Sequence, residues 1–166
     1  MFRIGNGFDV HRLQEGLPFW LGGLLIPHAK GCVAHSDGDA LIHAICDALL
    51  GAAALGDIGV HFPDTEAAYK NIDSKILLGK TAALIHAAGY TINNIDTVVC
   101  LEKPKIKEYI LSMRETLAKV LAISIEQISI KATTCERMGF VGREEGVSAY
   151  AVALLQRQDF CRLGNK

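Results

Sequence analysis

Val-Ser-Ala-Tyr-Ala-Val-Ala-Leu-Leu, residues 147–155, is the stretch that decides the fold. It follows the alternation of a β-strand, yet nearly all of its residues are apolar, including both Tyr150 and Ala151. Such a strand is buried on both faces, whereas a strand with one solvated face alternates apolar and polar residues. We therefore expect helices of the same chain to cover one face of its sheet. A second copy of the chain is expected to cover the other face.

Strands and helices around this stretch follow one another in a mixed order. The predicted strands are residues 2–11, a hairpin at 17–27 that turns at Gly22-Gly23, residues 91–101, and residues 128–134. The predicted helices are residues 38–55, capped by Asp37 or Asp39 and closed by Gly56, residues 74–88 between Asp73 and Gly89, and residues 105–121. This order predicts the α+β class, with a single mixed β-sheet and helices packed on one face.

Length and charge exclude several classes of protein. The chain has 166 residues, which predicts one domain over residues 1–166. Its net charge of −1 leaves no overall field for a nucleic-acid backbone or an anionic membrane, so neither is an expected partner. The five cysteines are odd in number and form no C-x-x-C pair, which favours reduced thiols. Without a signal peptide or a membrane-spanning run, the expected location is cytoplasmic.

A candidate metal site begins with Asp9 and His11. Two residues apart in an extended segment, they share one face of a strand and can reach one ion. The first predicted helix offers a third ligand, because Asp39, His43 and Asp47 are four apart and share a face. One carboxylate and two imidazoles with an open fourth position are typical of catalytic zinc, and Asp47 or Asp39 can steady the second ring nitrogen. The alternative is that Asp9 and His11 are solvated and His43 makes an ordinary polar contact.

Three further stretches are candidates for ligand binding. Residues 57–65, Asp-Ile-Gly-Val-His-Phe-Pro-Asp-Thr, are either a binding loop or an ordinary connection. Residues 102–107, Glu-Lys-Pro-Lys-Ile-Lys, lead into a helix, where lysines and free N–H groups either favour phosphate or form a solvated helix start. Residues 131–136 and 139–143 place hydroxyls, an acid, glycines and an arginine after a strand end, which is a weak signal alone.

Together these stretches resemble the 2-C-methyl-D-erythritol 2,4-cyclodiphosphate synthases, the ring-closing enzymes of the non-mevalonate isoprenoid pathway. The resemblance covers nearly the whole chain, and the joint presence of Asp9-x-His11 and residues 35–39, His-Ser-Asp-Gly-Asp, is highly specific. The other matching motifs are residues 3–5, 21–23, 26–27, 43–44, 47–52, 56–59, 62–65, 104–105, 131–134, 139–140 and 142–143. Cys135 departs from the pattern, since many members carry a third threonine there.

The resemblance implies a set of functional residues. Asp9, His11 and His43 match the family's zinc ligands, and Glu136 matches the ligand of a second divalent ion, Mg²⁺ or Mn²⁺. His35 and Thr134 match the residues that stabilise the transferring phosphates. The implied substrate contacts are Asp9, His11, His35, Ser36, Asp57, Ile58, Gly59, Phe62, Pro63, Asp64, Thr65, Glu66, Leu101, Glu102, Lys103, Pro104, Lys105, Ile106, Lys107, Thr133, Thr134, Cys135, Glu136, Phe140 and Arg143. Of these, residues 101–107 match the wall of a cytidine pocket.

The implied reaction converts 4-diphosphocytidyl-2-C-methyl-D-erythritol 2-phosphate to the 2,4-cyclodiphosphate. The 2-phosphate attacks the β-phosphorus and CMP leaves, which would make the chain a phosphorus–oxygen lyase. The implied assembly is a homotrimer, with the sheets facing the central axis and the active sites between subunits. Two alternatives use the same two histidines and one carboxylate: a non-haem Fe(II) oxygenase, and a metal-stabilised oligomeric binding protein.

Overall fold

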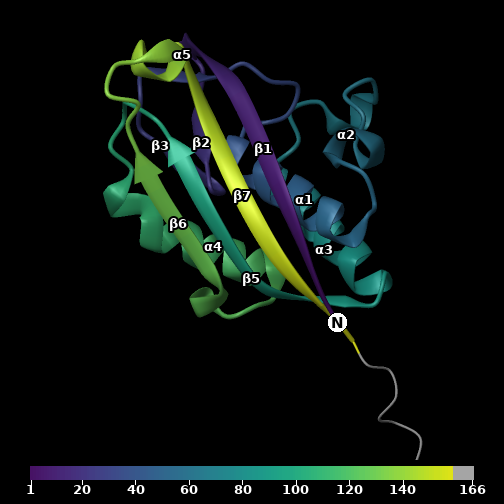
Figure 1. Ribbon diagram of the computed structural model, residues 1–166. Coiled ribbons are helices and arrows are strands. Elements are labelled where there is room, and N and C mark those ends of the chain that lie inside the picture. The colour runs from purple at the N-terminus through teal and green to yellow at the C-terminus, as the bar shows by residue number, and fades with distance from the viewer. Residues whose placement is uncertain (159–166) are drawn as a thin grey trace, which may run out of the picture.

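Five strands form one mixed sheet in the computed structural model, which describes residues 1–158 (Figure 1). Their order is β4-β1-β7-β5-β6, with bounds β1 Phe2–Glu15, β4 Lys30–Cys32, β5 Tyr90–Cys100, β6 Ile128–Thr133 and β7 Gly146–Arg157. β5 and β6 run parallel, and the other neighbours run antiparallel. The predicted hairpin, β2 (Phe19–Leu21) and β3 (Leu24–Ile26), forms a small sheet of its own. The prediction of an α+β chain with a mixed sheet is confirmed.

Strand β7 has small residues on one face and large apolar residues on the other. Ala149, Ala151 and Ala153 are at most 1% exposed, and helix α1 (Ala40–Ala53) packs on β7. Tyr150 and Val152 point to the opposite face, where they are 50% and 42% exposed. The helices therefore cover only one of the two apolar faces that the sequence predicts.

The other face of the sheet is apolar and exposed in the single chain. Besides Tyr150 and Val152 it carries Ile4, Phe8 and Val10 of β1, and we call these five residues the outer apolar face. The rings of Phe8 and Tyr150 lie 4.8 Å apart. That a second copy of the chain covers this face stays a prediction.

Three longer helices, α1, α3 (Ser74–Ala87) and α4 (Ile110–Leu121), lie together behind the strands in the view of Figure 1. Two one-turn helices, α2 (Ile58–His61) and α5 (Gly139–Gly142), lie at the periphery. Three 3₁₀ turns complete the described elements: η1 (Ala67–Tyr69), η2 (Lys107–Tyr109) and η3 (Ile125–Gln127). Helices packed on one face of the sheet are thus what the structure contains.

Two glycines of β1 set the distance between this strand and α1. A Cβ on Gly5 would lie 2.2 Å from the carbonyl oxygen of Ala48, and one on Gly7 would lie 2.0 Å from that of Ala44. No side chain fits at those distances, so backbone packs directly on backbone. The strand residues beyond Gly7 are therefore held close to the first turns of α1.

Several element boundaries differ from the prediction. Helix α1 ends at Ala53 because Ala54 adopts the left-handed conformation with φ 59°, two residues before Gly56. Helix α4 starts at Ile110 rather than at residue 105, because residues 107–109 form the 3₁₀ turn η2 that leads into it. Strand β4 was not predicted, since three residues are too few to show alternation. The caps Asp39 and Asp73 are confirmed.

Within residues 1–158, none of the helices has both the length and the hydropathy needed to cross a membrane. The thiols of Cys32, Cys46, Cys100 and Cys135 are free, as expected. The fifth cysteine, Cys161, lies outside the described residues.

Candidate active site

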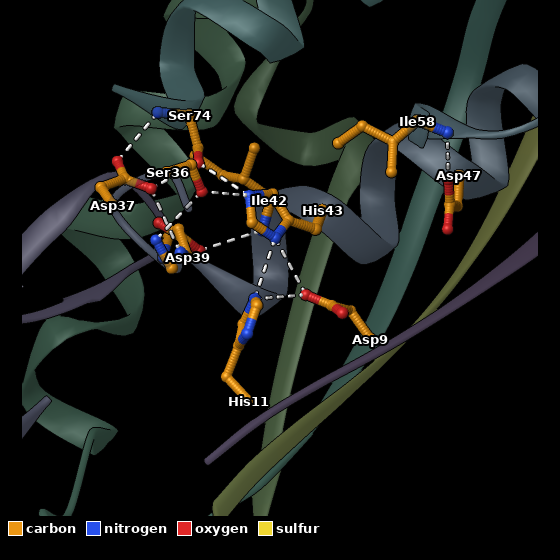
Figure 2. Close-up of polar contacts among 12 residues, drawn as sticks. Asp9, His11, Ser36, Asp37, Asp39, Ile42, His43, Asp47, Ile58 and Ser74 are labelled. Carbon is orange, nitrogen blue, oxygen red and sulfur yellow. Dashed lines mark hydrogen bonds and ion pairs between the residues drawn. The ribbon is translucent and has the colours of Figure 1, made fainter. Parts of the chain in front are cut away.

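Three donor atoms converge where β1 passes α1 (Figure 2). Oδ2 of Asp9 lies 3.0 Å from Nε2 of His11 and 2.9 Å from Nδ1 of His43, and the two ring nitrogens are 3.1 Å apart. Two ligands of a tetrahedral zinc, each at about 2.0–2.1 Å, lie about 3.3–3.4 Å apart, so a small relaxation lets one ion contact all three atoms. The donor set fits a metal ion with three protein ligands and an open position.

Local structure explains why these residues meet. Alternation along β1 turns Asp9 and His11 toward the helices, on the same side as the buried Leu13. His43 lies in the first turns of α1, next to Ala44, whose backbone contacts Gly7. The predicted convergence of Asp9, His11 and His43 is therefore what the structure contains.

Charges within this group favour a cation. Burial alone would raise the pKa of Asp9, but hydrogen bonds and attraction from His11 and His43 outweigh burial and hold that pKa well below its usual range. Burial lowers the pKa of His43, but the hydrogen bond to Asp9 and the nearby carboxylates outweigh it, so the pKa is raised. Asp9 is therefore ionised at neutral pH, and its negative charge faces both rings.

The second nitrogen of His43 contacts two serines. Nε2 lies 3.0 Å from Oγ of Ser74, at the start of α3, and 3.2 Å from Oγ of Ser36. The Ser74 hydroxyl donates to Oδ1 of Asp37, and the Ser74 backbone N–H donates to Oδ2 of the same carboxylate at 2.8 Å. Asp37 is therefore joined to the ring of His43 through one hydroxyl group.

The two carboxylates predicted to orient the His43 ring accept hydrogen bonds from backbone N–H groups instead, so that prediction is wrong. Asp39 accepts hydrogen bonds from the backbone N–H groups of Gly22, Gly23 and Ile42, at 2.9, 2.6 and 3.0 Å. It thereby ties the hairpin turn to the start of α1. Asp47 accepts from the backbone N–H of Ile58 at 2.8 Å. Asp39, the N-cap of α1, and Asp47, one turn beyond His43, therefore bond to backbone N–H groups rather than to the ring.

A cavity of about 410 Å³, which we call the metal-side cavity, opens beside His11 and His43. Seven other predicted site residues line it: His35, Ser36, Ile58, Gly59, Phe62, Pro63 and Asp64. Sequence reasoning missed four lining residues, Ala34, Tyr69, Ile72 and Leu77. Three predicted residues are exposed and do not line it: Asp57, which caps α2 through the Val60 N–H, and Thr65 and Glu66.

A second, smaller cavity of about 150 Å³, the strand-end cavity, lies where β5 and β6 end. The predicted residues that line it are Leu101, Pro104, Lys105, Ile106, Lys107, Thr133 and Thr134, and Ala132 completes the lining. The remaining predicted residues lie outside its lining. Glu102 accepts from the Cys135 N–H, Lys103 pairs with Glu144, Glu136 accepts from the Thr134 hydroxyl, Arg143 pairs with Glu145, and Phe140 is 42% exposed.

The single chain does not bring the two cavities together. The first is lined by His11 of β1, His43 of α1 and residues between Ala34 and Leu77, and the second lies at the ends of β5 and β6. Strands β7 and β5 separate β1 from β6, which places those two strands about 14 Å apart at ordinary strand spacing (Figure 1). The predicted site residues therefore fall into two groups within one chain.

Sequence reasoning missed the roles of Ser74 and Asp37 at His43. Ser74 reads only as the first residue of a helix, and Asp37 only as one of two helix caps. No local pattern indicates that these residues, 37 apart in sequence, share a hydrogen bond. In the structure Ser74 is completely buried, and a buried hydroxyl at a helix start needs hydrogen-bond partners, which here are His43 and Asp37.

Fold and site together define a class of protein: an α+β chain in which a carboxylate and two histidines that can hold a metal ion lie beside a cavity of about 410 Å³. A family model described as the YgbB family matches residues 2–156. The chain belongs to this family.

Known relatives agree with this assignment. A protein of Bacteroides fragilis (strain YCH46) named 2-C-methyl-D-erythritol 2,4-cyclodiphosphate synthase is 61% identical over 93% of this chain and 98% of its own length. The bifunctional IspDF from Campylobacter jejuni matches 98% of this chain with a TM-score of 0.93 and 41% identity, but the match covers only 44% of that longer protein. The CDP complex of IspF from Plasmodium falciparum matches 95% of this chain and 97% of its own, with a TM-score of 0.84 and 34% identity.

Proposed function

We infer that this chain converts 4-diphosphocytidyl-2-C-methyl-D-erythritol 2-phosphate to 2-C-methyl-D-erythritol 2,4-cyclodiphosphate and releases CMP. It is a cyclodiphosphate synthase, as its close relatives are named, and the release of CMP makes it a lyase. The observation that carries the inference is the convergence of Asp9, His11 and His43 beside the metal-side cavity, in a chain 61% identical to such an enzyme.

Asp9, His11 and His43 are the residues that would hold the resident metal, which we propose is zinc. Two imidazoles and one carboxylate are a common donor set for zinc in catalytic sites, and the three atoms lie within 4.8 Å of one another. When bound, the metal supplies positive charge that polarises a phosphate oxygen.

The side chains have to position two phosphates against each other. A phosphate is already an ionised nucleophile at neutral pH, so the reaction needs geometry and charge neutralisation more than a general base. In this proposal His35 and Ser36, at the wall of the metal-side cavity, and Thr134, at the strand-end cavity, bind the phosphate oxygens. Asp57 and Gly59 bind the erythritol hydroxyls, and the loop from Phe62 to Glu66 excludes water from the reacting groups.

The strand-end cavity receives the nucleotide in this proposal. Leu101 and residues 104–107 form part of its wall, and Lys105 and Lys107 supply positive charge near the diphosphate. Glu136 is exposed beside Thr134, and a lone carboxylate of this kind suits Mg²⁺ or Mn²⁺, which complete their coordination with substrate phosphates and water. Thr133, Cys135, Phe140 and Arg143 provide the remaining contacts.

A homotrimer with sheets facing a central axis accounts for two features of the single chain. The outer apolar face is exposed, and large exposed apolar surfaces mark interfaces. The two cavities are apart within one chain, so a complete site needs the metal-side cavity of one subunit and the strand-end cavity of its neighbour. We also propose a single domain over residues 1–166 that acts in the cytoplasm; the family match to residues 2–156 supports the former.

Phosphorus NMR of the purified protein with the cytidylyl substrate tests the function. We expect the resonances of the substrate to give way to those of a cyclic diphosphate and of CMP. Zinc removal by a chelator should stop this conversion, and zinc addition should restore it. Oxygen uptake without CMP would instead favour the Fe(II) oxygenase. Metal-dependent folding with no turnover would favour the binding protein.

A further inference from the structure

The ring of His43 has two nitrogens in different surroundings. Nδ1 faces Asp9 and His11, where a metal is bound in the proposed site, and Nε2 faces the hydroxyls of Ser74 and Ser36. A neutral imidazole carries one proton, so one nitrogen donates while the other has the free electron pair that a metal needs. Whatever fixes the proton on Nε2 therefore makes Nδ1 available.

Asp37 fixes the direction of the hydrogen bond at Nε2. An ionised carboxylate only accepts, so the single hydroxyl proton of Ser74 is donated to Oδ1 of Asp37. Only the electron pairs of the Ser74 oxygen are then left for His43, 3.0 Å away, and Nε2 must be the donor. Ser36 does not impose this direction, because its oxygen accepts from the Gly38 N–H at 3.2 Å and its own proton is free to rotate.

The carboxylate of Asp37 is itself held in place. Its Oδ2 accepts from the backbone N–H of Ser74 at 2.8 Å, and its own backbone N–H donates to the carbonyl of Ile72 at 3.1 Å. Ser74 is fully buried. The pair therefore cannot turn away from His43 without breaking several hydrogen bonds and leaving the buried Ser74 without its partners.

We propose that Asp37, acting through Ser74, is a positioning residue that keeps Nε2 of His43 as a hydrogen-bond donor and so leaves Nδ1 free to bind the metal. The proposal rests on the proposed metal site, though not on the reaction carried out there. Carboxylates that orient a metal-binding histidine directly are common, and their loss typically weakens metal binding about 10–100-fold. Here one serine stands between the carboxylate and the ring.

The Asp37→Asn variant tests this direction. Both carboxylate oxygens of Asp37 accept a backbone N–H, Oδ2 from Ser74 at 2.8 Å and Oδ1 from Asp39 at 3.2 Å. The amide oxygen of asparagine keeps the shorter of these two bonds, so the amide NH₂ group faces the Ser74 hydroxyl and donates to it. The serine proton then points at Nε2, where two donors oppose each other. We expect zinc affinity, measured by competition with a chelator, to fall about tenfold or more. In ¹⁵N-labelled zinc-loaded protein, the Nε2–H signal of His43 should shift and exchange faster with water.

Asp73→Asn is the matched control, because Asp73 is the neighbouring carboxylate, caps α3 through the Lys75 N–H at 2.8 Å and does not contact His43. Its zinc affinity and His43 signal should stay as in the wild type. Unchanged affinity and an unchanged signal in Asp37→Asn would overturn the proposal. If that variant does not fold, Ser74→Ala gives the answer by the same two measurements. Both measurements are made without substrate, so a chain that binds zinc but releases no CMP would contradict the proposed function and leave this proposal standing.

Discussion

The metal ligands beside the metal-side cavity and the polar residues of the strand-end cavity differ in burial and in hydrogen bonding. His43 is 9% exposed, its neighbour Asp39 is fully buried, and hydrogen bonds fix both ring nitrogens. In the strand-end cavity Lys105 and Lys107 are exposed side chains, and Thr133 lies at the end of an edge strand. The comparison indicates that one chain assembles the metal ligands by itself. The nucleotide side, in our proposal, is brought to the metal ligands by a neighbouring subunit.

The largest effect should come from substituting a metal ligand beside the metal-side cavity. His43→Ala removes one of three ligands from the proposed metal site, and we expect turnover to fall by about a thousandfold or more, since a metal supplies several kcal/mol of charge stabilisation. Zinc content by elemental analysis should fall in parallel. Circular dichroism should match the wild type, and full activity in a zinc-depleted buffer would refute the assignment.

A smaller effect is expected from separating β1 and α1. In Gly7→Ala the new Cβ meets the Ala44 carbonyl at 2.0 Å, so strand and helix have to move apart. Overpacking of this kind costs about 1–3 kcal/mol of unfolding free energy, which urea denaturation measures. Zinc affinity should weaken as well.

Gly51→Ala provides the matched control for Gly7→Ala. Gly51 lies on α1, and the nearest atom to its added Cβ, the Asn6 carbonyl oxygen, is 3.9 Å away. There alanine should be neutral or stabilise by about 0.5–1 kcal/mol, because it favours helix. Equal destabilisation by the two substitutions would show that the close contact is not what matters.

In the strand-end cavity we expect a substitution to weaken substrate binding without slowing the chemical step. Lys105→Ala should raise KM for the cytidylyl substrate about tenfold, as expected for one hydrogen bond to a charged group, with kcat little changed. Lys119→Ala, an exposed lysine on α4 outside the cavity, should leave both constants as they are. A fall in kcat with unchanged KM would place Lys105 at the reacting phosphates instead.

The smallest effect concerns pH in the metal-free protein. Burial lowers the pKa of His43, but Asp9 more than compensates and the folded-state pKa lies above the ordinary 6.5. The resulting stability is full below 6.5 and is lost as pH rises through the higher folded value. The Tm of metal-free protein should therefore fall over that range. This fall should be smaller in Asp9→Asn, and an equal fall in both proteins would contradict the role of the pair.

Periodicity was enough to predict most elements of this fold. Alternation located β1, β6 and β7, and the helical spacing with an acidic cap located α1 and α3. It also placed Asp9 and His11 on one face, because that inference needs only the geometry of a strand. Boundaries were less predictable, since Ala54 adopts a left-handed conformation that its residue type does not favour.

Contacts between distant segments could not be predicted in the same way. Spacing proposed Asp39 or Asp47 as the partner of His43, but packing gives that place to Ser74 and Asp37. The separation of the two cavities follows from the strand order, in which β7 lies between β1 and β5. Order across a sheet depends on tertiary pairing, which local propensity does not determine.

The pairing of Phe2 with Gln156 has a practical consequence for engineering. It brings the start of β1 and the end of β7 together at one end of the sheet, while Asp9 lies seven residues further along, roughly 24 Å away. A second protein fused at either of these positions would sit far from the metal ligands. A short linker between them would also close the chain into a ring, so this molecule is well suited to circular permutation.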